Sequence, residues 1–552
     1  VLVDGVRIND PSITDDQAAL GDVLVNDIDR VEILRGPQST LYGSQAIGGV
    51  VNIITRMGGD APFAVRASAE GGSFDTYRLN TAANGTYDIV DYGVALNYLS
   101  SGGISAADKA NGNEETDGYR NTGATGNVRV HVADNVSIDL RGYYTGSQTD
   151  IDGYPPTNYT FGDDPEFGRN DLEAGYAGVN ADFFGGMFHN RLAFTASHSD
   201  RRFFGIYTGF TPDTFTPDLN DYNKAGTTRV EYQGTLNVND DNQLTFGAES
   251  ERNTMNAMSQ YDATPTLGAR RTTSGYAQWQ TTLFDQLTLT GGVRYDGDSQ
   301  YGGHTSIKLA GAWRVMDWGT VIHTNYGDGF EAPSLYQLYS QYSLPADLGQ
   351  LKPETARGWE VGVEQPFLDN HARASVTWFS RKTKNEIDFF TCPYIPPVPG
   401  LPGCDVRQTQ GGYYYNVGQS RSQGAEFELS GDVIENVTAS INVTDMASED
   451  IEQHTDLARR PRITADGSLF WTPMDRASLG LTISHVGDRF DDTMEAVPLR
   501  NYTIVDVLGS YPLDGHVSLF GRVENLFNDR SEPVGGYGAP GRAAYVGIKA
   551  AF

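Results

Sequence analysis

The chain has 552 residues, with 64 Gly, 30 Tyr and 25 Phe but only 2 Cys, and its formal net charge is −31. The aromatic content excludes a disordered chain, the scarcity of cysteine excludes a disulfide-built scaffold, and the negative charge argues against a nucleic-acid partner. No run approaches the roughly 20 consecutive apolar residues of a membrane helix, which excludes helical membrane proteins. A glycine-rich, aromatic and acidic chain is typical of a large all-β protein, and a bacterial outer membrane is one place for it.

The first sixty residues lack the rhythm of the rest of the chain. Val1 starts a strand-like run over residues 1–8 with no Met or signal sequence before it, so we expect the natural amino terminus to be missing. The lack of a signal is then no evidence for the cytoplasm. A second run, residues 28–34, leads into the turn Arg35-Gly36-Pro37. The segment 41–55 is glycine-rich, and we expect its glycines mainly to permit close backbone approach.

Residues 61–552 alternate between apolar and polar side chains. Clear examples are residues 136–144, 287–295, 479–484 and 545–552. This period of two predicts strands with two different faces. Ten short turn signals alternate with eleven longer polar segments, which predicts about 22 strands.

Unequal connections favour a membrane barrel over a soluble β-sandwich, the other fold with such strands. Short turns at the periplasmic end and long external loops are typical of outer-membrane barrels. In lipid, only a closed barrel gives every strand backbone group an internal partner. A barrel of this size has a lumen wide enough for a plug. The sequence therefore predicts an all-β, antiparallel transmembrane β-barrel over residues 61–552, surrounded by outer-membrane lipid, with residues 1–60 as a separate domain.

Several motifs that suggest enzyme chemistry lack the context that the chemistry needs. Residues 536–541 fit a GxGxxG pattern, but Pro540 lies inside it and no helix follows, so a nucleotide site is not expected. The chain contains no HExxH, GxSxG or Walker-type sequence. We therefore expect no enzyme activity and no required cofactor.

Two features of the long loops allow specific predictions. Cys392 and Cys404 bracket a proline-rich segment in one external loop, where an oxidising compartment favours a disulfide. Acidic residues crowd another external loop, at Asp150, Asp152, Asp163 and Asp164. Carboxylates at this density could hold a structural Ca²⁺ ion. The alternative is a merely solvated acidic loop, because the spacing is not that of an EF-hand and the chain is acidic throughout.

The segment up to residue 60 resembles the plug, or hatch, domain of TonB-dependent outer-membrane receptors. The resemblance rests on a long, nearly unbroken signature, in which we single out Arg35, Gly36, Pro37, Tyr42, Gly43, Gly48, Gly49 and Asn52. Further family marks follow in order at residues 330–336, 351–354 and 525–528, and Phe552 matches the aromatic end that such barrels present to their assembly machinery. The resemblance covers essentially the whole chain, except for the start of the plug and the TonB box, which we expect to be absent.

The resemblance implies a transporter in the bacterial outer membrane. Its partners would be TonB with its inner-membrane energising complex, the barrel assembly machinery and a small-molecule ligand, and we expect the receptor to be a monomer. In the family, plug arginines pair with barrel glutamates. Arg35 would then pair with Glu360 or Glu364.

Within the family, the chain most resembles the cobalamin (vitamin B12) receptors. The resemblance lies in the sequence of residues 46–55 and in the carboxyl-terminal segment from Gly536 to Phe552. By position, ligand contacts of that group fall on Asn9, Asp10, Ser12 and Thr14, and some of its members bind calcium in early loops. Tyr413 and Tyr414 could stack on a planar ligand or pack within their loop. We therefore expect cobalamin import. The alternatives are a ferric-siderophore or haem receptor and, from a different class, a passive porin or a surface adhesin.

Overall fold

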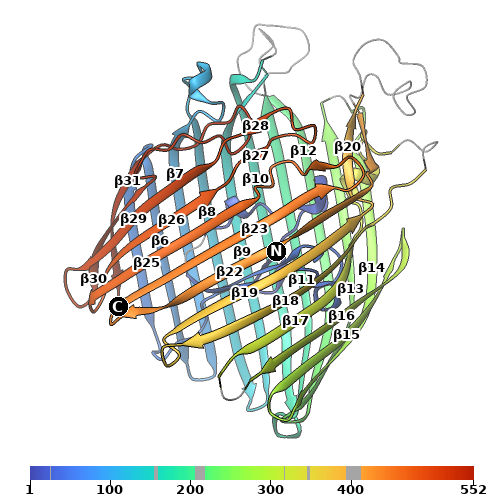
Figure 1. Ribbon diagram of the computed structural model, residues 1–552, viewed down its shortest axis with the longest axis vertical. Helices are drawn as coiled ribbons and strands as arrows, with labels where there is room; N and C mark the ends of the chain where they lie inside the picture. The colour runs from blue at the N-terminus through green and yellow to red at the C-terminus, as the bar shows by residue number, and fades with distance from the viewer. Residues whose placement is uncertain are drawn as a thin grey trace.

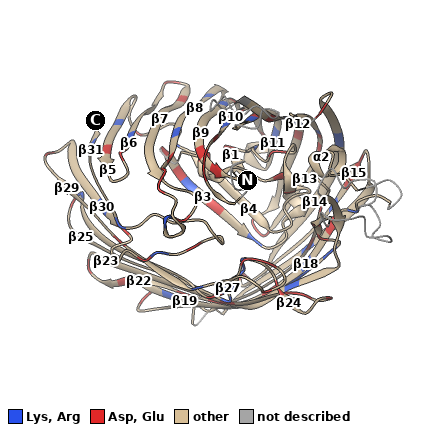
Figure 2. Cartoon of the chain, turned by 90° about the horizontal axis from the view of Figure 1, so that it is seen from above, with Lys and Arg blue, Asp and Glu red and all other residues tan. Residues whose placement is uncertain are grey.

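The computed structural model describes residues 1–24, 27–154, 160–205, 218–260, 262–315, 318–344, 349–392 and 412–552. Two bodies are visible in it, a closed barrel and a smaller domain in its lumen (Figures 1 and 2). No helix among the described residues is long and apolar enough to cross a membrane.

The barrel is a closed antiparallel sheet of 22 strands, as predicted. Its strands are β5 (Ala64–Gly72), β6 (Thr76–Tyr87), β7 (Val90–Ile104), β8 (Asp117–Ala133), β9 (Val136–Gly153), β10 (Gly162–Phe183), β11 (Phe188–Gly205), β12 (Asp218–Asn239), β13 (Asn242–Ser259), β14 (Thr266–Leu283), β15 (Leu287–Asp298), β16 (Gly302–Arg314), β17 (Val321–Glu331), β18 (Glu354–Phe367), β19 (Ala372–Lys384), β22 (Gln419–Ile434), β23 (Val437–Asp450), β25 (Ile463–Met474), β26 (Ala477–Val486), β29 (Tyr502–Pro512), β30 (Val517–Glu524) and β31 (Ala543–Ala551). The sheet closes where β31 pairs with β5. There the backbones of Phe552 and Val65 exchange hydrogen bonds of 3.0 and 2.9 Å.

The predicted alternation of apolar and polar side chains places them on opposite faces of the barrel wall. In β9, Ile138 and Leu140 are exposed on the outer face, whereas Asp139 is buried. Asp139 accepts hydrogen bonds from Arg129 and Arg141, so the lumenal face carries charges that pair with one another. An apolar outer face and a polar lumen are what a lipid-embedded barrel requires.

Long and short connections lie at opposite ends of the barrel (Figure 1). Short turns join the strands at one end, for example at residues 88–89, 134–135 and 435–436. The long loops at the other end carry small elements that the sequence did not predict. These are η3 (Lys109–Asn111), α2 (Leu335–Tyr339), β20 (Ile387–Thr391), β21 (Gly412–Asn416), β24 (Thr455–Asp456), β27 (Arg489–Phe490) and β28 (Pro498–Leu499). A further short helix, η4 (Phe184–Gly186), forms one of the short turns.

The lumenal domain, called the plug below, contains a four-stranded sheet in the order β2-β1-β4-β3. Its elements are β1 (Leu2–Val3), β2 (Val6–Arg7), η1 (Thr14–Asp16), η2 (Leu20–Asp22), β3 (Ile28–Arg35), α1 (Ser39–Tyr42) and β4 (Gly49–Thr55). Val3, Val6 and Ile53 pack against the wall residues Leu172 and Tyr176 in one apolar cluster. The plug is thereby held against one side of the barrel, and its chain passes into β5 after residue 55.

Candidate functional site

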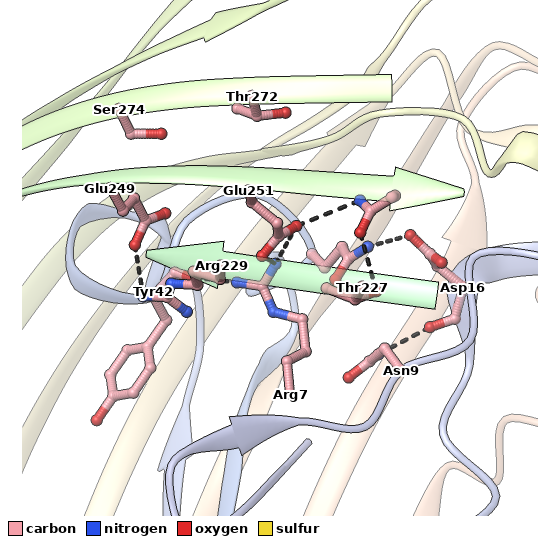
Figure 3. Close-up of polar contacts among 12 residues, drawn as sticks. Arg7, Asn9, Asp16, Tyr42, Thr227, Arg229, Glu249, Glu251, Thr272 and Ser274 are labelled. Atoms are coloured by element: carbon pink, nitrogen blue, oxygen red, sulfur yellow. Dashed lines mark hydrogen bonds and ion pairs between the residues drawn. The ribbon is translucent and has the colours of Figure 1, made fainter. Parts of the chain in front are cut away.

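A buried ion network joins the plug to the barrel wall (Figure 3). Arg7 of β2 donates to both carboxylate oxygens of Glu251 at 2.9 and 2.8 Å, and to the carbonyl of Tyr42 at 2.7 Å. Beside this pair, Glu249 accepts from Arg229 and Arg294, both on the wall. Because Arg7 comes from the plug, the wall carboxylate Glu251 is left without its guanidinium partner if the plug leaves. The sequence did not single out this pair.

Below the outer loops, the plug buries a second carboxylate. Asp16 is 1% exposed, accepts a hydrogen bond from Gln45 and lies 3.8 Å from Arg270 of β14. Its Oδ1 atom has no hydrogen-bond partner among the described residues. Burial, which outweighs the nearby arginine, raises the pKa of Asp16 to about 6. The Asp16 carboxylate is therefore protonated more readily in the docked plug than it would be in water.

The signature residues of the plug have mostly architectural positions. Gly43 has φ +80°, and a Cβ there would lie 2.9 Å from Nη2 of Arg294. Gly49 has φ +151°, and a Cβ there would lie 2.5 Å from the carbonyl oxygen of Leu34. Two further signature positions lie against the barrel wall: Pro37 packs on Gly327 and Gly358, and a Cβ at Gly48 would meet Arg381. Two others have roles inside the plug, since Gly36 has φ +71° and Asn52 donates to Glu32.

Arg35 pairs with the barrel, but not with the glutamates that the sequence suggested. Its guanidinium contacts Glu426 and lies 3.3 Å from Glu428, both on β22. Glu360 and Glu364 line the same cavity without an ion pair to Arg35 among the described residues. The sequence could not show which glutamate pairs with Arg35, because all four glutamates face the lumen. Only the position of β3 in the fold decides which of them Arg35 can contact.

Three of the predicted ligand residues, Asn9, Asp10 and Ser12, bond within the plug or between the plug and the barrel wall. Asp10 accepts from Ser12 and from Ser199 of β11, and both Asp10 and Ser12 are buried. Asn9 donates to the backbone of Asp16. In this conformation these side chains hold the plug segment 9–16 in place. Its crest, the part that contacts the outer loops, includes Pro11, Thr14 and Asp15.

Thr14, at that crest, meets an aromatic cluster of the outer loops. Its hydroxyl lies 2.8 Å from the hydroxyl of Tyr414. Tyr414 in turn contacts Phe389 and Tyr336, with ring centroids 5.2 and 6.3 Å apart, and Phe389 contacts Tyr342. Two of the predicted ligand residues, Thr14 and Tyr414, are thus brought together.

The second predicted tyrosine and the predicted disulfide lie beside this cluster. Tyr413 is buried and packs against Phe390 and Cys392. Cys392 is disulfide-bonded, whereas Cys404 lies outside the described residues. Next to the aromatic cluster, Tyr336 and Tyr342 line a cavity of about 170 Å³ that also contains Asp221 and Asp262.

Two outer loops bring three carboxylates together. Oxygens of Glu115, Asp152 and Asp163 all lie within 4.8 Å of one another. Beside them Asp164 is 1% exposed, and neither of its carboxylate oxygens has a hydrogen-bond partner among the described residues. Asp150 is close enough to help raise the pKa of Glu115, which burial and the carboxylates of Asp152 and Asp163 raise first. Such a cluster of hard oxygen donors has the chemistry of a divalent-cation site.

The sequence named Asp152, Asp163 and Asp164 but missed Glu115. Glu115 lies between β7 and β8, and the three aspartates lie at the facing ends of β9 and β10. The acidic run around residues 114–117 was the available signal. Only the barrel, which places these two loops side by side, makes that run part of the cluster.

Comparison with known families agrees with this architecture. The family model described as "TonB dependent receptor-like, beta-barrel" matches residues 110–526, and the model "TonB-dependent Receptor Plug Domain" matches residues 1–50. A plug is therefore present, and the expectation that its beginning and the TonB box are absent is not borne out.

Solved structures of the same fold include several receptors. The ferric enterobactin receptor PfeA from Pseudomonas aeruginosa, crystallised as a mutant, is 20% identical, with a TM-score of 0.81 over 100% of this chain and 90% of that one. The siderophore receptor PirA from Acinetobacter baumannii is 18% identical (TM-score 0.79, 100% and 90% covered). FpvA from P. aeruginosa, bound to a heterologous ferric pyoverdine, is 14% identical (TM-score 0.76, 96% and 78% covered). At these identities the likeness establishes the fold.

Proposed function

This chain belongs to the TonB-dependent receptor family, and we propose that it imports a ferric siderophore. At the coarser level its role is that of a transport receptor in the bacterial outer membrane, and neither the family nor the neighbouring structures suggest an enzyme. The finer statement, the ligand, is the proposal.

The observation that carries the proposal is the set of structural neighbours, which are named as siderophore receptors. The prediction of cobalamin has no such support. The aromatic cluster around Tyr414 adds a physical reason, because the flat rings of an aromatic chelate can pack against Tyr336 and Phe389 above the plug crest. The ligand would enter from the loop end and meet the crest at Thr14.

Transport requires a movement of the plug, because the plug lies in the bore and is bonded to the wall through Arg7 and Glu251. For the same reason a passive porin is disfavoured. We propose that TonB supplies the work, acting on the plug from the short-turn end of a monomeric receptor. The receptor carries no nucleotide motif of its own.

Ligand binding to the purified receptor tests the choice of ligand. Quenching of intrinsic fluorescence should give saturable binding of ferric enterobactin at micromolar or lower concentration and none of cyanocobalamin. The variant Tyr414→Ala should weaken binding about fivefold, since a stacked aromatic contact contributes about 1 kcal/mol. Tyr511→Ala, at the opposite end of the barrel, is the matched control. Binding of cyanocobalamin alone would restore the original prediction.

We also propose that Glu115, Asp152 and Asp163 hold a divalent cation that ties the two outer loops together. The support is the spacing of their oxygens and the unpartnered carboxylate of Asp164 beside them. Ca²⁺ fits this all-oxygen set.

Calcium titration of the receptor in detergent tests this cation site. Ca²⁺ at 100 times its dissociation constant should stabilise the protein by about 2.7 kcal/mol. The gain should disappear in Asp152→Asn/Asp163→Asn and persist in Asp182→Asn, which changes an acid at the other end of the barrel. An equal gain in all three proteins would contradict the site.

A further inference from the structure

Attachment of the plug to the barrel is uneven. Many bonds from plug to wall fall between β8 and β16, where Figure 2 also shows β1 and β4 beside β9, β11 and β13. These contacts are Thr55 with Asn127, Asp22 with Thr145, Asp10 with Ser199, Arg7 with Glu251 and Gln38 with Lys308. Outside this stretch, Asp27 pairs with Arg66 of β5, and Arg35 pairs with Glu426 of β22. Along β25, β26, β29, β30 and β31, the described part of the chain shows no hydrogen bond or ion pair from plug to wall. On this side, a shift of the plug breaks the fewest bonds.

A cavity of about 570 Å³ lies on this weakly attached side. It lies at the short-turn end, between β26, β29, β30, β31, β5 and β6. Its volume is in the range of small-molecule sites. Its charged lining consists of Arg66, Arg476, Arg522, Lys549 and His516 with a single acid, Asp27. Four permanent cations thus face one space in a chain whose net charge is −31.

Two of these cations, Arg476 and Lys549, form no ion pair among the described residues. Arg66 pairs with Asp27, and Arg522 pairs with Glu70 and Glu524. Arg476 instead donates to the carbonyl of Asp514 and to the hydroxyl of Ser518, at 2.8 and 3.1 Å. Lys549 lies opposite Ser518 in the strand register. The carboxylate of Asp514 is near enough to Arg476 to interact with it electrostatically, but the described residues give neither Arg476 nor Lys549 a carboxylate at ion-pair distance.

A second cavity, of about 470 Å³, flanks the plug at the same end but has the opposite character. Glu360, Glu364, Glu426 and Glu428 line it, with Arg35 and Lys308 as its permanent cations. Arg35 also ties the plug to the wall there. An anion would meet repulsion on that side and attraction at Lys549 and Arg476.

We propose that the cavity around Lys549 and Arg476 is an anion site on the exit route, which an anionic iron chelate occupies as it passes between plug and wall into the periplasm. This inference rests on the proposed function. A ferric catecholate is anionic because the charge of its oxygens exceeds that of Fe³⁺. Local positive charge raises the concentration of such an ion and its rate of passage.

The test measures surface binding and uptake of labelled ferric enterobactin separately, in cells with this protein as their receptor. Lys549→Glu/Arg476→Glu should leave binding unchanged and lower the uptake rate about tenfold. Lys549→Arg should keep the normal rate. Arg373→Glu, which removes a cation beside the acidic cavity at the same end, is the matched control and should also keep it.

Each result decides between the two proposals. Uptake by the unaltered receptor with an equal rate in the double variant would overturn the exit site and leave the proposed function standing. No uptake by the unaltered receptor would remove both. Loss of plug protection against protease in the double variant would show that the cations hold the plug instead, and would also overturn the exit site.

Discussion

At the scale of single residues, the two ion pairs between plug and barrel differ in burial. The side chains of Arg7 and Glu251 are 12% and 7% exposed, whereas Arg35 is 59% exposed. Breaking a buried pair leaves a charge without water or partner, whereas a solvated pair contributes little. The stability of the docked plug should therefore depend on Arg7 far more than on Arg35.

We expect Arg7→Ala to weaken docking of the plug by about 3–5 kcal/mol, because Glu251 remains buried and unpaired. Arg35→Ala should cost no more than about 1 kcal/mol. Limited proteolysis of the plug over a urea series measures both. The double variant Arg7→Met/Glu251→Leu should recover most of the loss, and failure to do so would show that packing, not charge, holds this contact.

The raised pKa of Asp16 predicts a pH dependence. Because burial raises its pKa from the ordinary value of 3.8 to about 6, its favourable contribution is full below pH 3.8 and is lost as the pH rises through about 6. Asp16→Asn should then be close to neutral at pH 4 and stabilise the plug at pH 8 by on the order of 3 kcal/mol. Thermal unfolding at the two pH values measures this. A gain that is the same at both would contradict a charged, buried Asp16.

Some site residues could be predicted from the sequence and others could not. Asp152 and Asp163 stood out because acids crowd one stretch of chain. Arg7 and Glu251 are 244 positions apart and belong to no local pattern, so only the fold pairs them. Thr14 and Tyr414 were both named, but their direct contact follows from the docking of the plug.

At the scale of elements, the pairing of β3 with β4 depends on one glycine. Gly49 faces Arg35 in the register, and its Cβ would lie 2.5 Å from the carbonyl oxygen of Leu34. Neither the β3 nor the β4 backbone can move away without breaking the pairing of the two strands. The barrel strands, by contrast, follow from repeated alternation, which tolerates single exceptions.

Gly49→Ala should therefore destabilise the plug by about 3 kcal/mol or more, because the steric clash adds to the backbone strain. Gly5→Ala is the matched control, because Gly5 also has a positive φ, +85°, but no atom within 4 Å of its added methyl group. It should cost only the backbone strain, about 1–2 kcal/mol. Folding yield and urea midpoint of the two variants measure the difference, and equal losses would assign the whole effect to backbone strain.

The small elements of the outer loops could not be predicted from sequence patterns. Alternation predicted the 22 long strands because lipid imposes a strict two-faced rule along each of them. β20, β21 and α2 obey no such rule, since they pack on each other and on the plug. Tyr342 and Phe389 show this, as they meet across two loops. The proposed ligand site lies among these elements, which is why its geometry could not be predicted from the sequence.

At the scale of the whole molecule, the barrel and its plug form a gate whose two sides differ. The wall from β8 to β16 carries many of the bonds to the plug, and β26, β29, β30 and β31 line a basic cavity together with β5 and β6. The outer end offers aromatic rings and a cluster of acids. A molecule arranged in this way can capture a ligand at one end and release it at the other only when the plug moves.

Uptake of ferric enterobactin by cells that carry this receptor, with and without TonB, tests that claim most directly. The account predicts accumulation in the cell when TonB is present, and binding at the surface without accumulation when it is absent. Accumulation at the same rate without TonB would contradict it, because the plug would then not be a gate that TonB opens.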